Sequence, residues 1–489
     1  MNIKLSMQYR KKIKHYGDEK MKIIVDKNLL LQNNEKFIKF IRNASQEFFC
    51  FDLTNHQSLK EKYINCKFLK SDNISHKSDT SSNPAINHTD DYIIYVISQN
   101  KYDFYITNNE SILSLSQNVG IGDRILTQQD AYKLFTKQTI NYSLNSEFLT
   151  VDKIDVNDKI FDRLKISYSE FDDWFKRIQK QKRDAVVYYN NDRTLGGIVI
   201  FKEEREEIKL QDEILANENR LKVSTFIVTA NGYKIGELFI RIIIEKSSLL
   251  NINEIYLTHF VDNEDTDYLV SLIKQYGFTD IGSNKRGERI FIKKILPDQK
   301  VLNFKTRNDI LEFDKKYYPT FYNGPKVNKF LVPIRPQYYN RLFLQPKNSQ
   351  LTLSEFVGPL MERNTIKKAY ISKAKIKTIE PGDIIIFYCS HDKQALTALG
   401  IVEKTARLDS RENIIKMIGK RSVFSESEIE DTDQLVILFT YNCRIASNFN
   451  LSYLKKNGIL KGAPQSIMKF QNYNKVINNG GLNGCNTFN

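Results

Sequence analysis

Residues 228–240, with the sequence VTANGYKIGELFI, connect an apolar run to a helix-like run and carry Gly232 and Gly236 at the joint. A strand that ends in a glycine-containing turn and opens a helix brings backbone N–H groups to the positive end of the helix dipole. Such a joint binds anions without side-chain chemistry, although glycines also serve ordinary turns. Because GYKIGE lacks the Gly-Lys-Ser/Thr ending, the joint is not the loop of a nucleoside triphosphatase.

The length of the chain bounds its organisation. Its 489 residues exceed what one hydrophobic core usually supports, so about three domains are expected. No run of about 18 uncharged apolar residues occurs, which argues against a membrane span. The first 20 residues are basic and lack the apolar block of a secretory signal. We expect a disordered basic arm there or, alternatively, a true start at Met21.

The formal net charge of +15 points to polyanionic partners. Excess lysine attracts nucleic acid through Coulomb forces and counterion release, and RNA is the favoured partner over DNA. An AT-rich genome would raise the Lys, Asn and Ile content without any such function. Both explanations of the charge remain open at this stage.

The cysteines form no metal-binding or disulfide pattern. They are odd in number and widely spaced, and none forms a C-x-x-C pair: Cys50, Cys66, Cys389, Cys443 and Cys485. Neither structural zinc nor a disulfide framework is expected. This usage is typical of a reducing compartment, so a cytoplasmic protein is predicted.

The patterns predict a multidomain chain of α/β and α+β class. In the first block, strands such as KIIVD alternate with helices, which implies a parallel sheet with crossover helices. The last folded block is rich in strands, and its turns carry Pro381-Gly382-Asp383 and Gly400, as a small β-barrel requires. The expected units are a basic arm (1–20), a parallel α/β domain (21–145), a mixed-sheet α/β domain (146–296), a linker (297–328), a barrel (329–478) and a disordered tail (479–489).

The element order of residues 146–296, together with the opening stretch, resembles the GNAT superfamily of N-acetyltransferases. In that family a strand, a turn of the form Q/R-x-x-G-x-G/A and a helix bind the pyrophosphate of acetyl-CoA. NGYKIG places Asn231 at the Q/R position, Lys234 at the first glycine and Gly236 at the last, so two of three signature positions depart. The resemblance implies acetyl-CoA as cofactor, bound by Val228, Asn231, Gly232, Lys234, Ile235, Gly236 and Glu237.

His259 is the candidate catalytic base. It ends the strand IYLTHF, which in the GNAT fold splays beside the cofactor. Aminolysis of a thioester needs a group that accepts the proton of the amine, directly or through water. The alternative is a structural histidine near a strand end. The family's general-acid tyrosine is replaced by Ile273, and no acid is assigned.

The first block resembles the PIN domain, a parallel-sheet nuclease fold whose strand-end carboxylates hold Mg²⁺ or Mn²⁺. IIVDKNLL places Asp26 at the first acid, and HTDDYIIYVIS places Asp91 (or Asp90) at a later one. Asn109 stands where the family has an aspartate, and an amide in place of a carboxylate weakens cation binding. We therefore expect a domain that no longer cleaves RNA, with a metal-dependent ribonuclease as the alternative.

The third block resembles the PUA-like barrels of the ASCH and EVE families, which are associated with RNA and modified bases. The matching segments are KAYISKAKIKTIEPGDIIIFYCS and ALTALGIVEKT. Cations and an aromatic face near a barrel mouth suit backbone contact and base stacking, and amide or hydroxyl groups can read a base edge. The candidate nucleic-acid contacts are Lys367, Lys368, Tyr370, Gln465 and Ser466; the alternative is ordinary solvated residues.

These blocks together predict an acetyl-CoA-dependent N-acetyltransferase with nucleic-acid-associated domains on either side. The acceptor is expected to be a nucleic-acid-associated or translation-related amine, with RNA as one candidate. The alternatives are a toxin-like PIN-type ribonuclease and a non-catalytic reader of modified nucleic acid.

Overall fold

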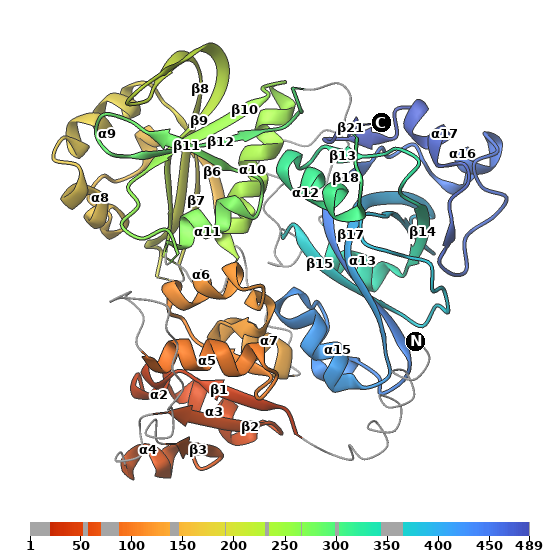
Figure 1. The fold of residues 1–489 in the computed structure, drawn as a ribbon, viewed down its shortest axis with the longest axis horizontal. Helices are drawn as coiled ribbons and strands as arrows, with labels where there is room; N and C mark the ends of the chain where they lie inside the picture. The colour runs from red at the N-terminus through yellow and green to blue at the C-terminus, as the bar shows by residue number, and fades with distance from the viewer. Residues whose placement is uncertain are drawn as a thin grey trace.

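The described part of the protein is a multidomain α/β chain with a five-stranded parallel sheet, two mixed seven-stranded sheets and a two-stranded parallel sheet, shown in Figure 1. The computed structural model describes residues 20–51, 57–69, 88–136, 146–190, 192–229, 234–265, 267–298, 303–343 and 365–488. Within these residues, no helix combines the length and apolar character that crossing a membrane requires.

The first domain is built on a five-stranded sheet in the order β3-β2-β1-β4-β5, and every neighbouring pair is parallel. Its strands are β1 (Lys22–Val25), β2 (Glu47–Phe51), β3 (Cys66–Leu69), β4 (Phe104–Ile106) and β5 (Ile125–Leu126). Its helices are α2 (Lys27–Leu31), α3 (Glu35–Asn43), α4 (Gln57–Lys62), α5 (His88–Ser98), α6 (Glu110–Asn118) and α7 (Gln128–Phe135). Residues of α5 and α6 pack on one face of the sheet, and residues of α2, α3, α4 and α7 pack on the other. The predicted parallel α/β architecture is confirmed, whereas membership of the PIN family stays a prediction.

The second domain has a seven-stranded sheet in the order β11-β12-β10-β9-β8-β7-β6. Its strands are β6 (Ser146–Thr150), β7 (Asp184–Tyr189), β8 (Leu195–Lys209), β9 (Ile214–Val228), β10 (Glu254–His259), β11 (Thr279–Ser283) and β12 (Arg289–Lys294). Its helices are α8 (Asp162–Ser167), α9 (Phe171–Lys180), α10 (Ile235–Leu249) and α11 (Tyr268–Lys274). Residues of α10 and α11 bury one face of the sheet, and residues of α9 bury the other. The mixed sheet expected for this block is confirmed.

The third domain carries a second seven-stranded sheet, in the order β15-β18-β17-β16-β14-β19 with β20 paired to β18. Its elements are α12 (Arg307–Tyr317), β13 (Phe321–Tyr322), β14 (Lys329–Ile334), α13 (Pro336–Leu342), β15 (Lys367–Ser372), β16 (Ile384–Cys389), β17 (Ala395–Leu408), α15 (Arg411–Ile418), β18 (Gln434–Ile445), α16 (Leu451–Lys456), β19 (Met468–Lys469), α17 (Tyr473–Asn478), β20 (Leu482–Asn483) and β21 (Thr487–Phe488).

The closed barrel predicted for this block is not present among the described residues, whose strand pairings form an open sheet. The physical reason is that helices already cover both faces. Along β16, Ile384 and Ile386 pack with residues of α12, α16 and α17. The alternating Ile385 and Phe387 belong to a core cluster that includes residues of α13, α15 and the first domain. Such a sheet buries its apolar faces without closing on itself.

The described residues of the segments expected as linker and tail include regular secondary structure. Residues 303–328 supply α12 and β13, and Phe304, Ile310 and Phe313 enter the third domain's core. At the other end, β20 pairs with β18 and β21 pairs with β13. The expectation of disorder is therefore wrong for residues 479–488, because strand pairing to existing sheets satisfies their backbone.

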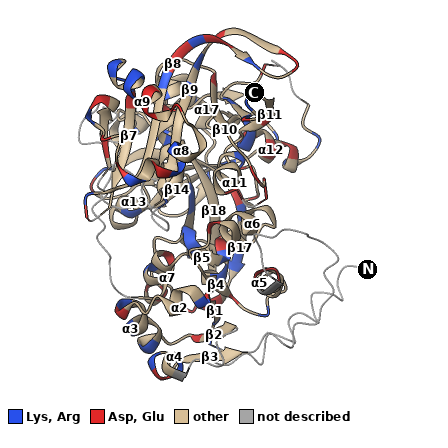
Figure 2. Ribbon diagram, turned by 90° about the vertical axis from the view of Figure 1, so that its left-hand side faces the viewer, with Lys and Arg blue, Asp and Glu red and all other residues tan. Residues whose placement is uncertain are grey.

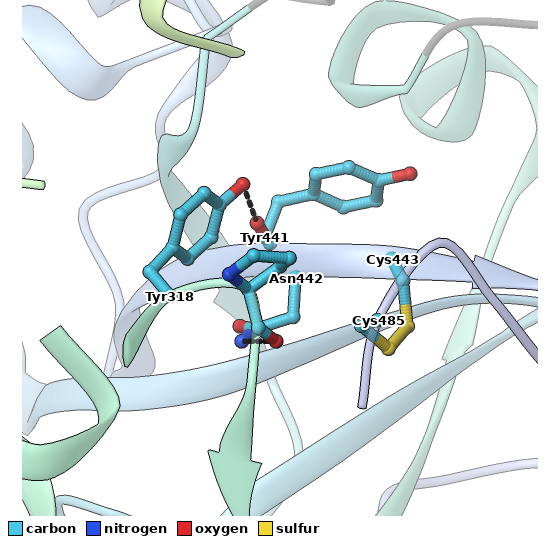
Figure 3. The surroundings of a disulfide bond; sticks show 6 residues. Tyr318, Tyr441, Asn442, Cys443 and Cys485 are labelled. Carbon is cyan, nitrogen blue, oxygen red and sulfur yellow. Dashed lines mark hydrogen bonds between the residues drawn. A yellow bond between two sulfur atoms is a disulfide. The ribbon is translucent and has the colours of Figure 1, made fainter. Parts of the chain in front are cut away.

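A disulfide joins Cys443 of β18 to Cys485, as Figure 3 shows. The absence of disulfides expected from cysteine spacing is therefore wrong. Pairing of Arg444 with Asn483 brings the two cysteines together across a sequence separation of 42 residues. The spacing of the cysteines along the chain gives no sign of this tertiary contact. With one disulfide present, the cysteines no longer support the prediction of a reducing compartment.

Candidate active site

The strands β9 and β10 separate at the centre of the second domain. They pair in parallel from Arg220 opposite Glu254 to Val223 opposite Leu257. Beyond this point β9 continues beside β8, and β10 continues beside β12 as far as His259. The wedge between the diverging strands opens into a cavity of about 350 Å³, lined by residues of both strands.

The remaining walls of the cavity combine aromatic and charged side chains. Aromatic residues come from the region of α8 and α9 and from β9: Tyr168, Phe171, Trp174 and Phe226. The charged residues in the lining are Glu170, Arg177, Arg183, Lys222, Arg286 and Glu288. This composition suits a polar organic substrate with a flat or apolar portion.

His259 lines the cavity and forms a side-chain hydrogen bond with an aspartate that the sequence patterns did not reveal. Its Nε2 lies 2.7 Å from Oδ2 of Asp267. Asp267 caps the N-terminus of α11, where its Oδ1 accepts from the backbone N–H of Val270 at 3.0 Å. Burial alone would raise the pKa of Asp267, but the hydrogen bond and charge of His259 and the backbone N–H donors lower it. A neutral His259 that donates through Nε2 keeps Nδ1 to accept a proton.

A second polar group lines the same cavity around the buried carboxylate of Glu288. Its Oε1 accepts from Tyr168 Oη at 2.7 Å and from Thr258 Oγ1 at 3.2 Å. Its Oε2 accepts from Asn284 Nδ2 at 2.7 Å. Burial and the neighbouring Glu288 raise the pKa of Tyr168, so its hydroxyl stays protonated at neutral pH. Sequence reasoning missed this group because its members come from three separate segments: Tyr168 after α8, Thr258 of β10, and the turn that carries Asn284 and Glu288.

The loop before α10 was predicted to hold the cofactor. Lys234 caps α10 with a left-handed backbone (φ 53°) and makes no side-chain capping bond, while its Nζ donates to the carbonyl of Lys420 at 2.5 Å. Val228 ends β9 and is half-buried, and Ile235 is buried in the core. Asn231 and Gly232 lie outside the described residues.

Gly236 and Glu237, the other predicted cofactor contacts, are used in packing. A Cβ on Gly236 would lie 2.6 Å from Leu272 Cδ2, so this glycine lets α10 approach α11 closely. Oε1 of Glu237 accepts from the backbone N–H groups of Ile366 and Lys367 at 2.8 and 2.9 Å, and from Tyr276 Oη at 2.8 Å. Glu237 therefore connects the second domain to the third.

The acids predicted to hold Mg²⁺ or Mn²⁺ are engaged elsewhere or dispersed. Asp26 is buried; its Oδ1 accepts from the N–H of Asn28 at 2.9 Å, capping α2, and its Oδ2 accepts from Thr107 Oγ1 at 2.6 Å. Asp90 and Asp91 lie in the first turn of α5. Within the described ranges, no group of three or more His, Cys, Asp or Glu side chains is arranged to hold a metal. The described geometry gives the metal hypothesis no support.

Two of the predicted nucleic-acid contacts are buried. Lys368 is 1% exposed and Tyr370 is 8% exposed, and Tyr370 Oη donates to the carbonyl of Pro333 at 2.8 Å. Nζ of Lys367 donates to Gln275 Oε1 of the second domain at 3.0 Å. The prediction of base stacking and backbone contact is wrong for Lys368 and Tyr370. Both side chains are buried by neighbouring elements, so they cannot reach a nucleic acid on the surface.

Gln465 and Ser466 are exposed in the loop before β19, so their predicted contact with a base stays a prediction. In Figure 2, Asp and Glu accompany Lys and Arg over all three domains. The excess positive charge is thus not gathered into one separate region in this view. Charge alone does not identify a nucleic-acid surface on the described part of the chain.

No family model matches the chain, and no curated protein matches it. Among solved structures, ASCH from Zymomonas mobilis is 12% identical over 33% of this chain and 98% of its own length, with a TM-score of 0.24. A GNAT-family acetyltransferase from Listeria monocytogenes is 17% identical over 28% of this chain and 90% of its own, with a TM-score of 0.20. The NatC complex bound to Gag peptide and CoA is 16% identical over 31% of this chain and 100% of that chain, with a TM-score of 0.23.

These structural neighbours therefore include ASCH proteins and N-acetyltransferases, each over about a third of the chain. Likenesses with such low TM-scores carry no argument about the activity.

Proposed function

We propose that the chain is an acetyl-CoA-dependent N-acetyltransferase whose acceptor is a nucleic-acid-associated or translation-related amine, with RNA as one candidate. One observation carries the proposal: β9 and β10 diverge beside a cavity at which His259 is held by Asp267. A strand wedge gives an extended acyl donor access to the sheet, and the histidine supplies a base where the amine would react.

The residues of the cavity suit the proton transfer that amide formation requires. Bound acetyl-CoA would supply an activated acetyl thioester. Transfer would form a bond from the acceptor nitrogen to the acetyl carbon and break the carbon–sulfur bond, with CoA leaving as the thiolate, and the nitrogen would have to lose a proton. Nδ1 of His259 accepts that proton directly or through water, and Asp267 stabilises the resulting imidazolium.

Cofactor binding is assigned to the wedge and to the N-terminal end of α10. Val228, Lys234 and Ile235 border this end among the described residues. The first backbone N–H groups of a helix have no partners within the helix, and its dipole favours phosphate there. Because Gly236 and Glu237 serve packing, we give them a supporting function rather than direct contact with the cofactor.

Two measurements test the proposal. Isothermal titration of the full chain with acetyl-CoA should show binding; a folded protein that binds nothing at high micromolar ligand contradicts the proposal. Incubation with acetyl-labelled acetyl-CoA and fractionated RNA and protein pools should then place the label on an amine. The His259→Gln variant should bind the cofactor normally and transfer little label, which separates the base from the cofactor site.

A further inference from the structure

The first domain contacts the segment that presents Asp267 to His259. Ser114 lies in α6 and is fully buried. Its one hydroxyl proton is shared between the backbone carbonyl of Asp265, 3.0 Å from Oγ, and that of Asp267, 3.3 Å from Oγ. A single hydroxyl thus bridges from the first domain to the backbone that carries Asp267, the partner of the candidate base His259.

Neighbouring contacts join the same two segments. Ser271 of α11 donates through Oγ to the carbonyl of Ser114 at 3.5 Å, and Asn118 Nδ2 donates to the carbonyl of Asp265 at 3.5 Å. Figure 1 shows α6 directly beside α11, at the boundary between the first and second domains. The chain around Asp265 and Asp267 therefore receives hydrogen bonds from the first domain as well as from its own domain.

The position of α6 is in turn fixed by the first domain's sheet. Asn109 caps α6, and its backbone N–H donates to Thr107 Oγ1 at 3.0 Å. The same hydroxyl donates to Asp26 Oδ2 at 2.6 Å, at the carboxyl end of β1. Hydrogen bonds and one helix thus connect the strand ends of the first domain to Ser114 and onward to Asp267.

We propose that Ser114 is a positioning residue for the His259–Asp267 pair, so that the first domain sets the geometry of the second domain's active site. This inference rests on the acetyltransferase function proposed above. Asp267 can orient the imidazole only if its Oδ2 stays within hydrogen-bonding distance of His259 Nε2. The capping bond to α11 holds the other oxygen, Oδ1. The Ser114 hydroxyl fixes the backbone on which that carboxylate is mounted.

The decisive variant is Ser114→Ala, with Ser116→Ala as a matched control. Ser116 is equally buried on α6, but its Oγ donates to Leu113 within the same helix at 2.8 Å. Both variants delete one buried hydroxyl, and only the first deletes a bond to the Asp267 segment. The experiment measures kcat, KM for acetyl-CoA, the unfolding temperature and the ¹⁵N NMR signals of the His259 imidazole in the full chain. A His259→Gln variant assigns those signals among the six histidines.

Ser114→Ala should lower kcat roughly five- to tenfold, the loss expected for one hydrogen bond, without changing KM for acetyl-CoA. It should also shift the His259 nitrogen signals away from those of a ring bonded to a carboxylate. Ser116→Ala should change neither quantity, although both variants lower the unfolding temperature. If Ser114→Ala matches Ser116→Ala in the His259 signals and in kcat, the positioning function is refuted. If no variant transfers acetyl groups, the proposed function fails, and the NMR comparison alone still decides the positioning.

Discussion

Two aspartates in this protein occupy the same structural position and differ in what they can do. Asp26 in the first domain and Asp267 in the second each cap a helix by accepting a backbone N–H through Oδ1. The Oδ2 of Asp26 accepts from the hydroxyl of Thr107, whereas the Oδ2 of Asp267 pairs with the imidazole of His259. A hydroxyl does not titrate near neutral pH and an imidazole does, so only the second pair can move protons.

The comparison shows why a strand-end acid is weak evidence for a site. In both aspartates, helix capping uses one carboxylate oxygen and leaves the other oxygen for a second partner. The group that meets the second oxygen decides between a structural and a chemical use. In the first domain that group ties β4 to β1, and in the second it faces a cavity.

Removing the imidazole should have the largest effect. His259→Ala is expected to lower kcat for acetyl transfer by about 10²–10³-fold, the range for loss of a general base, with little change in acetyl-CoA affinity. Steady-state kinetics measure kcat, and isothermal titration measures the affinity for acetyl-CoA. An unchanged rate would make His259 a structural histidine.

Neutralising the two aspartates tests the comparison directly. Asp267→Asn keeps a capping side chain and loses the charge, so kcat should fall by roughly 10- to 100-fold while helix capping persists. Asp26→Asn makes the same chemical change in the first domain and should lower kcat much less than Asp267→Asn does, because Asp26 reaches Asp267 only through Thr107, α6 and Ser114. Equal effects of the two substitutions on kcat would contradict the distinction drawn here.

The Asp26→Asn variant also addresses the ribonuclease alternative. If RNA cleavage that depends on Mg²⁺ or Mn²⁺ is detected and disappears in this variant, Asp26 has a chemical use that its described contacts do not indicate. The same protein preparations and an RNA substrate with end label are sufficient for this measurement.

A third carboxylate, Glu237, resembles Asp26 in that its observed hydrogen bonds are structural. Glu237→Ala leaves two backbone N–H groups and the Tyr276 hydroxyl without their acceptor, which should lower the free energy of unfolding by about 1–2 kcal/mol. Glu237→Gln retains an acceptor oxygen and should lose less. Denaturant titration measures both variants. A loss of acetyl-CoA affinity larger than the loss of stability would restore the cofactor contact that the sequence predicts for Glu237.

Local patterns predicted most elements of the fold, because hydrophobic periodicity and turn residues act over a few residues. The strand that ends at Val228 and the helix that begins at Ile235 belong to this class, as does the parallel sheet whose strand β1 precedes Asp26. Contacts between distant segments were missed. The sequence motifs identified His259 but not Asp267, although an aspartate just before the apolar run YLVSLI is a capping signal. Lys368 and Tyr370 look accessible in sequence and are buried by tertiary packing.

The smallest expected effect concerns the pH dependence of stability. The pKa of Asp267 is lowered in the folded protein, chiefly because His259 offsets the cost of burial. A group with a lowered folded pKa stabilises the protein above its unfolded pKa, near 3.9 for aspartate, and this contribution disappears as the pH falls through the folded pKa. Wild type should therefore exceed Asp267→Asn in unfolding free energy at neutral pH, measured by denaturant titration, and the difference should shrink as the pH falls below about 4. A stability difference for Asp267→Asn that stays constant down to pH 3 would show that its charge is not held by His259.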